Sequence, residues 1–372
     1  MVAEGDELRR VPDATWKLMM ESGFLRAYQP TRFGGGEVTL LDFVESAAEI
    51  SRWNPSAGWV AGVIGVHPWQ LALFSEEAQQ EMWGSDPTTM HSSSYNPTGK
   101  AVKVTGGYEV SGRWSFSSGC DHCIHVNLGA VVRNSESPIP DFRSFLLHPG
   151  QYRIDDTWHV VGLKGTGSKD IIVEPTFVPD YRTQSHVDYA MGSPLPGQVL
   201  NDGPLYRLPW SVVFNAALAA CVLGAAQGFV DTWIAESRDR VMGGSSGGKR
   251  LADEALAQRR LADALWTLDA AFAMMRADAV ELWDMALAHH PATMQERGRF
   301  RWNLNRGCEL VSSAVVDLFH AASGRVIFLD HPLQRRFQDV QAAMGHAFLV
   351  PDPLAKAVGG SLLGATSPEF VM

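Results

Sequence analysis

The stretch of sequence between residues 91 and 122 decides the fold class. It begins His91-Ser-Ser-Ser-Tyr-Asn-Pro-Thr-Gly-Lys100 and ends Gly112-Arg-Trp-Ser-Phe-Ser-Ser-Gly-Cys-Asp-His122. Between these segments, short alternating runs on both sides of Gly106-Gly107 predict a β-hairpin. Two hydroxyl-rich segments beside one hairpin can face a shared ligand, although Ser, Thr and Gly clusters form turns more often than binding sites.

Strand-like runs continue to about residue 204. Gly, Pro, Asn and Ser separate segments such as Ile124–Leu128 and Ser144–Leu147. No helical segment of ten residues alternates with these strands, which argues against a parallel sheet with helical crossovers. We therefore expect residues 90–204 to form a compact β-barrel or sandwich.

The sequence on either side of this region has helical patterns. Before residue 90, apolar residues recur every three or four positions, as in Leu40, Phe43, Val44 and Ala47. From Trp210 onward, two longer apolar seams predict helices packed as an antiparallel bundle; they are Leu261, Leu265, Leu268, Phe272, Met275, Ala279, Leu282 and Leu304, Cys308, Val311, Val315, Leu318. We expect an α+β protein with a helical domain at 1–89, a β-barrel domain at 90–204 and a helical bundle at 205–372.

Composition restricts the function class. The 372 residues are 45% hydrophobic and 19% charged, and the net charge is −10. An acidic chain is poorly suited to nucleic acid or to an anionic membrane surface. Asn215 and Gln227 interrupt the apolar stretch Val212–Val230, which favours a core helix over a membrane span. The N-terminus has no basic start and apolar run, and four cysteines do not form a disulfide framework, so we expect a cytoplasmic protein.

Three features invite a chemical interpretation. Cys120-Asp-His-Cys123 lacks a second pair of ligands nearby, which argues against a zinc site. Gly162-Leu-Lys-Gly-Thr-Gly-Ser168 lacks the spacing of a phosphate-binding loop. His67 and His346 are the best acid–base candidates, although a lone histidine is more often structural; Pro68, directly after His67, predicts the start of a helix.

Taken together, these segments resemble the acyl-CoA dehydrogenase fold, with an N-terminal helical domain, a middle β-barrel and a C-terminal four-helix bundle. The closer resemblance is to the oxygenase components of two-component (group D) flavin-dependent monooxygenases, such as the hydroxylases of p-hydroxyphenylacetate and of phenolic secosteroids. The segments that carry the resemblance are Gly65–Phe74, Ser92–Gly99, Trp114–His122, Asp156–Ser168 and Pro332–Arg335 with Asp339 and His346.

One absence separates the two branches of this fold. Acyl-CoA dehydrogenases remove a proton with a carboxylate, commonly a Glu after the helix that corresponds to Pro332–Asp339. Val340–Pro351 contains no Asp or Glu, and His346 lies there instead. The alternatives that stay open are an acyl-CoA dehydrogenase-like flavoenzyme, an N-hydroxylating monooxygenase of the same fold, and a scaffold protein without chemistry.

The monooxygenase resemblance implies a mechanism and partners. A separate flavin reductase supplies reduced flavin, FMN rather than FAD, with FAD as the alternative. Dioxygen forms a hydroperoxide at the flavin C4a and its distal oxygen passes to a ring carbon of a small aromatic, phenolic substrate. The fold implies a homotetramer, and no metal takes part.

The resemblance also implies roles for individual residues. Ser118 corresponds to the serine beside flavin N5, His67 to a histidine that hydrogen-bonds the phenol, and His346 to a histidine near the peroxide. The implied cofactor-binding residues are Ser93, near the pyrimidine edge of the flavin, and Ser94, Ser118, Thr166, Ser168 and Arg240.

Overall fold

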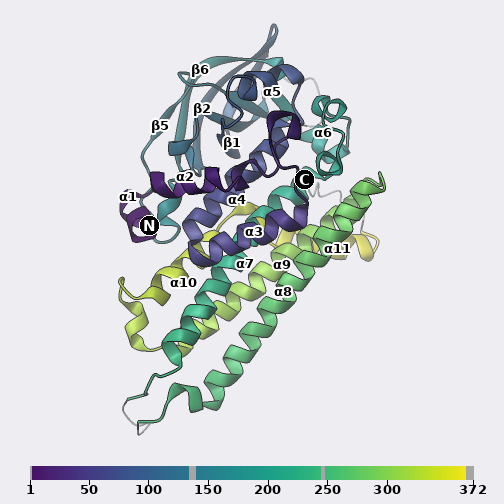
Figure 1. Ribbon diagram of the computed structural model, residues 1–372. Helices are drawn as coiled ribbons and strands as arrows, with labels where there is room; N and C mark the ends of the chain where they lie inside the picture. Colours follow the sequence, from purple (N-terminus) through teal and green to yellow (C-terminus); the bar gives the residue numbers. More distant parts are fainter. Residues whose placement is uncertain (1, 134–139, 244–247, 366–372) are drawn as a thin grey trace.

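The computed structural model describes residues 2–133, 140–243 and 248–365. Figure 1 shows the sheet at one end of the molecule, the long helices at the other, and α3 and α4 between them. The N-terminal helices are α1 (Val2–Leu8), α2 (Asp13–Glu21), α3 (Leu40–Trp53), α4 (Pro55–Leu71) and α5 (Glu76–Trp83).

The sheet has seven strands in the order β5-β6-β2-β1-β3-β4-β7. The strands are β1 (His91–Val104), β2 (Gly107–Ser117), β3 (His125–Val132), β4 (Phe142–Leu147), β5 (Arg153–Asp155), β6 (Lys169–Pro179) and β7 (Thr183–Ser185). The predicted hairpin is confirmed, because Val104 of β1 pairs with Gly107 of β2.

The prediction of a closed barrel is wrong. Among the described residues, the edge strands β5 and β7 do not pair with each other, so the sheet is open. It is also mixed, because β1 and β3 run parallel while the other pairs are antiparallel. Sequence reasoning missed the parallel pair because parallel strands usually need a helical crossover; here β2 and the short turn Cys120–His122 make the connection.

The C-terminal helices form the second large part of the molecule. They are α7 (Trp210–Ser237), α8 (Ala255–Leu287), α9 (Met294–Ala321), α10 (Pro332–Ala343) and α11 (Asp352–Leu362), and α6 (His186–Met191) follows the sheet. One described helix, α7, is long and apolar enough to span a membrane, but 94% of its apolar window is buried inside the protein. The prediction that Val212–Val230 lies in a core helix is therefore confirmed.

Glycines allow α7 to approach α3 closely. A Cβ on Gly224 would lie 2.0 Å from the carbonyl oxygen of Ala48, so only a glycine fits at this crossing. The N-terminal helices and the bundle consequently share one hydrophobic core, while most of the sheet has a separate core.

We expect Gly224→Ala to lower the free energy of unfolding by about 1–3 kcal/mol, because the added methyl must push two helices apart. Urea unfolding followed by circular dichroism measures this change. The matched control is Gly359→Ala on α11, where the new Cβ would meet no atom within 4 Å, and which should gain about 0.5–1 kcal/mol from helix propensity. Equal midpoints for the two variants would contradict the close-packing argument.

Candidate active site

His67 lies near the end of α4 and is fully buried. Its Nδ1 is 2.7 Å from the carbonyl oxygen of His91, and its Nε2 is 2.8 Å from Oγ of Ser93 on β1. A carbonyl oxygen only accepts, so Nδ1 carries the proton and Nε2 accepts the hydroxyl proton of Ser93. Burial lowers the pKa of His67 to about 4, which keeps the ring neutral.

The expectation that Pro68 starts a helix is wrong, because α4 runs from Pro55 to Leu71 and includes it. The helix begins at Asn54, whose side chain accepts a hydrogen bond from the backbone N–H of Ala57, and Pro55 occupies the first turn. Nearly every residue of α4 is buried, so packing on all sides outweighs the hydrogen bond that Pro68 cannot donate.

The serines beside Ser93 connect two strands. Ser94 Oγ donates to the carbonyl oxygen of Ser115 at 2.7 Å, and Ser117 Oγ donates to Ser92 Oγ at 2.9 Å. The hydroxyl proton of Ser94 is therefore committed to strand pairing. Of the two serines predicted to bind cofactor here, Ser93 is the one that contacts the acid–base candidate.

A second hydroxyl cluster consists of Ser118, Ser168 and Thr166. Ser168 Oγ lies 2.7 Å from the hydroxyl oxygens of both Ser118 and Thr166. Thr166 donates its proton to the carbonyl oxygen of Leu163 at 3.0 Å, so Ser168 donates to Thr166, and Ser118 donates to Ser168. Trp59 Nε1 donates to Ser118 Oγ at 3.3 Å. One lone pair of Ser118 Oγ is left to accept a proton from a ligand.

Helix α10 holds the loop that carries Thr166 and Ser168. The backbone N–H of Leu163 donates to Asp339 Oδ1 at 2.7 Å, and Leu163 has φ +52. A Cβ on Gly162 would lie 2.1 Å from the carbonyl oxygen of Gln338, so the loop presses directly on the helix. Burial raises the pKa of Asp339 to about 6.

His346 follows α10, and its ring meets the edge of Trp59 with 5.7 Å between centroids. Its Nδ1 accepts the backbone N–H of Phe348 at 3.2 Å, which leaves the ring proton on Nε2. His346 is exposed, but the groups packed around its ring desolvate it and lower its pKa to about 4.

Two buried amides fix the backbone after His346. Asn215 of α7 and Asn305 of α9 both donate to the carbonyl oxygen of Phe348, at 3.1 and 2.9 Å, and Asn305 also donates to that of Val350 at 3.2 Å. The bundle thus determines where His346 lies.

A run of contacting aromatic rings connects His346 with His67. Centroid distances are 6.3 Å for His346–Phe348, 5.4 Å for Phe348–Trp210, 4.6 Å for Trp210–Phe214 and 6.0 Å for Phe214–His67. The structure therefore connects His67 and Ser93 with His346 through one run of contacting aromatic rings, and Trp59 connects His346 with the cluster of Ser118, Ser168 and Thr166.

Sequence reasoning missed Trp59, Trp210, Phe214 and Phe348. They lie on elements that are apolar on all sides, or in a short loop, so no periodicity distinguishes a site-facing ring from a core ring. An indication that was available is the aromatic content close to both histidines, with Trp59 before His67 and Phe348 after His346.

Arg240 does not join the site within one chain. It follows α7, and its carbonyl oxygen accepts from the backbone N–H of Leu251 at 2.9 Å. Figure 1 shows that the segment after α7 lies at the end of the bundle farthest from the sheet.

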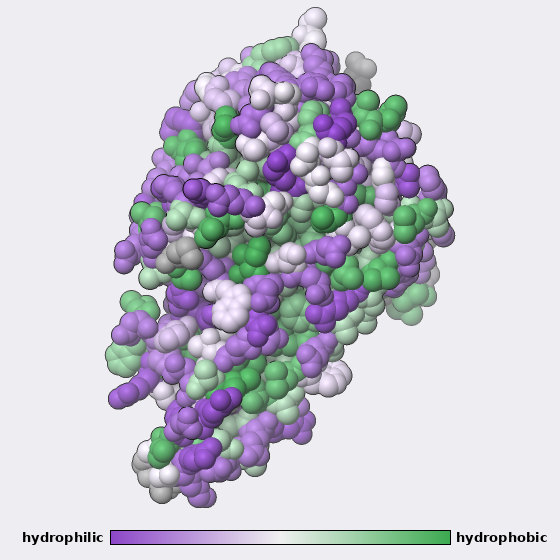
Figure 2. Space-filling model, viewed as in Figure 1, coloured by the Kyte–Doolittle hydropathy of each residue, from purple (hydrophilic) through white to green (hydrophobic). Residues whose placement is uncertain are grey.

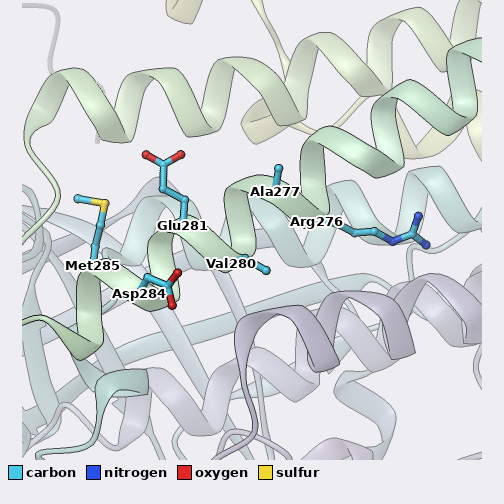
Figure 3. A pocket seen from close by; sticks show the side chains of 6 residues that line it. All are labelled: Arg276, Ala277, Val280, Glu281, Asp284 and Met285. Carbon is cyan, nitrogen blue, oxygen red and sulfur yellow. The ribbon is translucent and has the colours of Figure 1, made fainter.

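The other chemical features of the sequence lie outside this space. Cys120 and Cys123 are buried free thiols. Among the described residues, no three His, Cys, Asp or Glu side chains are placed to hold a metal ion. Figure 3 shows a hollow on α8 whose lining side chains, Arg276, Ala277, Val280, Glu281, Asp284 and Met285, include none of the candidates.

Buried histidines make folding depend on pH. Burial lowers the pKa of His67 and His125 to about 4 and that of His186 to about 3. Because an unfolded histidine protonates near pH 6.5, the unfolded state binds more protons below that pH. The free energy of unfolding should therefore be highest above pH 7 and fall between about 6.5 and 4, by up to about 1.4 kcal/mol per pH unit for each histidine.

Urea midpoints between pH 8 and pH 5 measure this slope. His125→Asn should reduce the pH dependence of the unfolding free energy by the contribution of one histidine. Replacement of the exposed His320 by Asn should leave this pH dependence unchanged. A flat profile in the unmodified chain would contradict the assignment of neutral buried rings.

Models of two known protein domains match the N-terminal and C-terminal parts of the chain. The model of the acyl-CoA dehydrogenase N-terminal domain matches residues 1–89, and that of the C-terminal domain matches residues 216–351. Together with the sheet between them, these matches define the class of protein: it has the acyl-CoA dehydrogenase fold.

Individual relatives narrow the class. The chain is 37% identical to the flavin-dependent monooxygenase oxygenase subunit HsaA of Rhodococcus jostii, over 94% of this chain and 91% of the relative. It is 32% identical to the oxygenase component of the FADH2-dependent resorcinol hydroxylase of a Rhizobium species, over 96% and 89%. The crystal structure of 3-HSA hydroxylase from Rhodococcus sp. RHA1 superimposes with a TM-score of 0.93 at 34% identity, covering 100% and 95%. The chain belongs to the oxygenase subunits of the flavin-dependent monooxygenases within the acyl-CoA dehydrogenase family.

Proposed function

We propose that this oxygenase holds reduced flavin between Ser118 and His346, and a phenol beside Ser93 and His67, and that it hydroxylates the phenol with O2. The observation that supports the proposal is that Ser93 is hydrogen-bonded to His67, while Ser118 and His346 both contact Trp59, and that a run of aromatic rings connects the two histidines. The two rings are neutral and carry their protons on opposite nitrogens. One group can accept a proton and the other can donate a hydrogen bond, which is what the two ends of this reaction require.

The residues of the cleft fit a flavin. Ser118 Oγ has a lone pair for a ring N–H, and Trp59 offers an aromatic wall beside it. When bound, reduced flavin supplies the electrons and the activation of dioxygen. A separate reductase delivers it, and the relative named for its flavin uses FADH2; FMN remains our prediction for this chain.

Ser118 would hold the proton of a ring N–H, which we propose to be N5–H, when reduced flavin is bound. Since its own proton is directed to Ser168, Ser118 would contact the flavin as an acceptor. The chain Trp59–Ser118–Ser168–Thr166 fixes that orientation, and Asp339 fixes the loop behind it. His346 would donate a hydrogen bond from Nε2–H to the reacting oxygen, and the aromatic rings around it would exclude water.

Ser93 and His67 act on the phenol. Ser93 gives its proton to His67 Nε2, so its lone pairs accept the phenol O–H. As the ring is attacked, the phenol proton moves toward Ser93 and the serine proton toward His67. The pKa of His67, about 4, lies far below that of a phenol, about 10. The pair therefore shares the proton while the ring becomes more nucleophilic, rather than storing a phenolate beforehand.

The test is an anaerobic titration with reduced FMN and reduced FAD, followed by O2, a panel of phenols and product analysis. We expect binding of the reduced form and a hydroxylated ring. Tight binding of oxidised FAD, with reduction by an acyl-CoA, would instead identify a dehydrogenase. The absence of a carboxylate from Val340–Pro351 speaks against that outcome.

We also propose the predicted organisation into domains at 1–89, 90–204 and 205–372, a homotetramer and a cytoplasmic location. The element boundaries agree with the domains, since α5 ends at Trp83, β1 begins at His91 and α7 begins at Trp210. Four free thiols favour a reducing compartment. Apolar side chains exposed on α8 favour association; they are Leu256, Trp266, Met274, Val280 and Leu287, and Figure 2 shows apolar patches among the polar residues of the bundle. Analytical ultracentrifugation measures the oligomeric state.

A further inference from the structure

A cavity of about 220 Å³ lies between the C-terminal end of α8, the first turn of α9 and the segment around α6. Figure 1 shows the C-terminal end of α8 beside α6. Asp188 of α6, Ala286 of α8 and Arg297 of α9 contribute to the wall of this cavity, and none of the candidate active-site residues does. A ligand in the cavity would therefore bind apart from the proposed phenol and flavin sites.

The wall of the cavity carries more positive than negative charge. Its guanidinium groups are those of Arg207 and Arg297, and its one carboxylate among the described residues is that of Asp188. His289 and His290 add two imidazole rings. The chain as a whole has a net charge of −10, so the positive excess is a local property of this wall. A concave surface of one charge concentrates ligands of the opposite charge, and here those ligands are anions.

Arg297 has two N–H groups available for a ligand. Its Nε donates to the carbonyl oxygen of Ala292 at 2.9 Å, and its Nη1 donates to those of Tyr189 and Ala190 at 3.2 and 2.9 Å. No described residue accepts from Nη2, which lies 3.4 Å from the position that a Cβ on Gly192 would take. Gly192 lines the cavity, so Nη2 lies beside the cavity wall.

Neither arginine forms an ion pair with a described residue. Arg207 donates to the carbonyl oxygens of Ala286 and Asp202. Burial lowers the pKa of Arg297, and no described carboxylate lies close enough to raise it again. A partly buried cation without a counterion gains strongly from an anion that donates no charge elsewhere, because charge-assisted hydrogen bonds are about twice as strong as neutral ones.

Trp210 adds a neutral donor to the same wall. Its side chain is only 6% exposed, and its Nε1 has no hydrogen-bond partner among the described residues. Buried polar atoms nearly always have partners, so this N–H needs an explanation. An acceptor oxygen bound in the cavity would provide one.

The remaining wall selects the body of the ligand. Much of it is apolar, and its members are Leu73, Leu195, Leu208, Pro209 and Pro291. Burial of apolar surface contributes about 25 cal/mol per Å², which a bare inorganic anion cannot gain. The volume is below the roughly 300–1,000 Å³ of a site for a drug-sized molecule. The cavity therefore suits a small molecule with one anionic end and one apolar end.

We propose that this cavity is a binding site for a small carboxylic acid, whose carboxylate contacts Arg297 and Arg207 and whose apolar body packs against Leu208 and Trp210. A carboxylate matches the planar fork of a guanidinium, which favours it over other anions of the same charge. This site is separate from the proposed phenol site, and the inference does not rest on the proposed function.

The test is calorimetric titration of the full-length protein with benzoate, cyclohexanecarboxylate, benzamide and inorganic phosphate. We expect both carboxylates to bind at one site per chain, and benzamide, the neutral analogue of benzoate, to bind at least about 10-fold more weakly. Arg297→Gln should weaken benzoate binding roughly 10- to 100-fold. Arg297→Lys should recover part of the affinity, because it keeps the charge but not the fork. Arg207→Gln should also weaken binding, and it gives an independent measurement if the Arg297 variants do not fold.

Arg299→Gln is the matched control, because Arg299 lies two residues further along α9 and pairs with Glu281. It should leave the affinity for benzoate unchanged. His67→Ala should also leave it unchanged, since a loss there would place benzoate in the phenol site and overturn the inference. Equal affinities for benzoate and benzamide, or unaltered benzoate binding in the Arg207 and Arg297 variants, would overturn the anion site. Tighter binding of phosphate than of benzoate would overturn the assignment of a carboxylic acid.

Discussion

His67→Ala is expected to slow phenol hydroxylation by about 10²–10⁴-fold, the usual loss when a positioned base is removed. Binding of reduced flavin should be unchanged, because the hydroxyl cluster at Ser118 does not contact His67. Product formed per flavin oxidised, measured with saturating phenol, reports the change. Ser93→Ala should cause a similar loss, and the double variant should lose little more, because residues that act as one unit are not additive.

His122→Ala is the matched control. Its ring is also largely buried, with Nε2 2.7 Å from the carbonyl oxygen of Val11, and it stacks on Trp16 outside the cleft. We expect a loss of stability there but a hydroxylation rate close to that of the unmodified enzyme. Comparable rates for the His67 and His122 variants would remove His67 from the mechanism.

Ser118→Ala is expected to divert oxygen from product to hydrogen peroxide. Leaving a buried N–H without its acceptor costs about 1–3 kcal/mol, so loss of hydrogen peroxide should become about 5–150-fold faster relative to hydroxylation. A peroxide assay alongside product analysis gives the ratio of the two. The reason is that Ser118 donates its own proton to Ser168, which leaves its Oγ as the proposed acceptor for flavin N5–H.

Ser117→Ala tests whether any buried hydroxyl would have the same effect. Ser117 is adjacent in sequence and equally buried, but its Oγ donates to Ser92 and not to the Ser168 cluster. Its peroxide yield should stay at the level of the unmodified enzyme. If both serine variants release equal amounts of hydrogen peroxide, the lower product yield reflects damage to the strand and not a missing acceptor for N5–H.

Much of the fold, and the polar residues proposed for the site, could be predicted from the sequence and its resemblance to a family. The hairpin at Gly106-Gly107 and the core helix Val212–Val230 follow from alternation and apolar length, and both are local properties. The grouping of Ser118 with Ser168 came from a family resemblance, since fifty residues separate them and no spacing connects them.

The remaining features depend on long-range packing. Whether β5 and β7 meet is decided by the twist and edges of the sheet, which no segment of sequence encodes by itself. Pro68 stays inside α4 because its surroundings are buried on all sides. Trp59 and Phe348 could not be distinguished from core residues, because a ring that faces a cleft and a ring that fills a core have the same hydropathy.

Helix α4 carries both Trp59, which contacts the proposed flavin ligand Ser118, and His67, the proposed partner of the phenol. Eight residues of α-helix span roughly 12 Å, and one added residue would shift and turn everything beyond it by about 1.5 Å and 100°. The length of this one helix therefore fixes the distance between the proposed flavin site and the proposed phenol site. We expect side-chain changes on β1 and α7 to alter which substrates fit. A change in the length of α4 between Trp59 and His67 would instead misalign the proposed flavin and phenol sites.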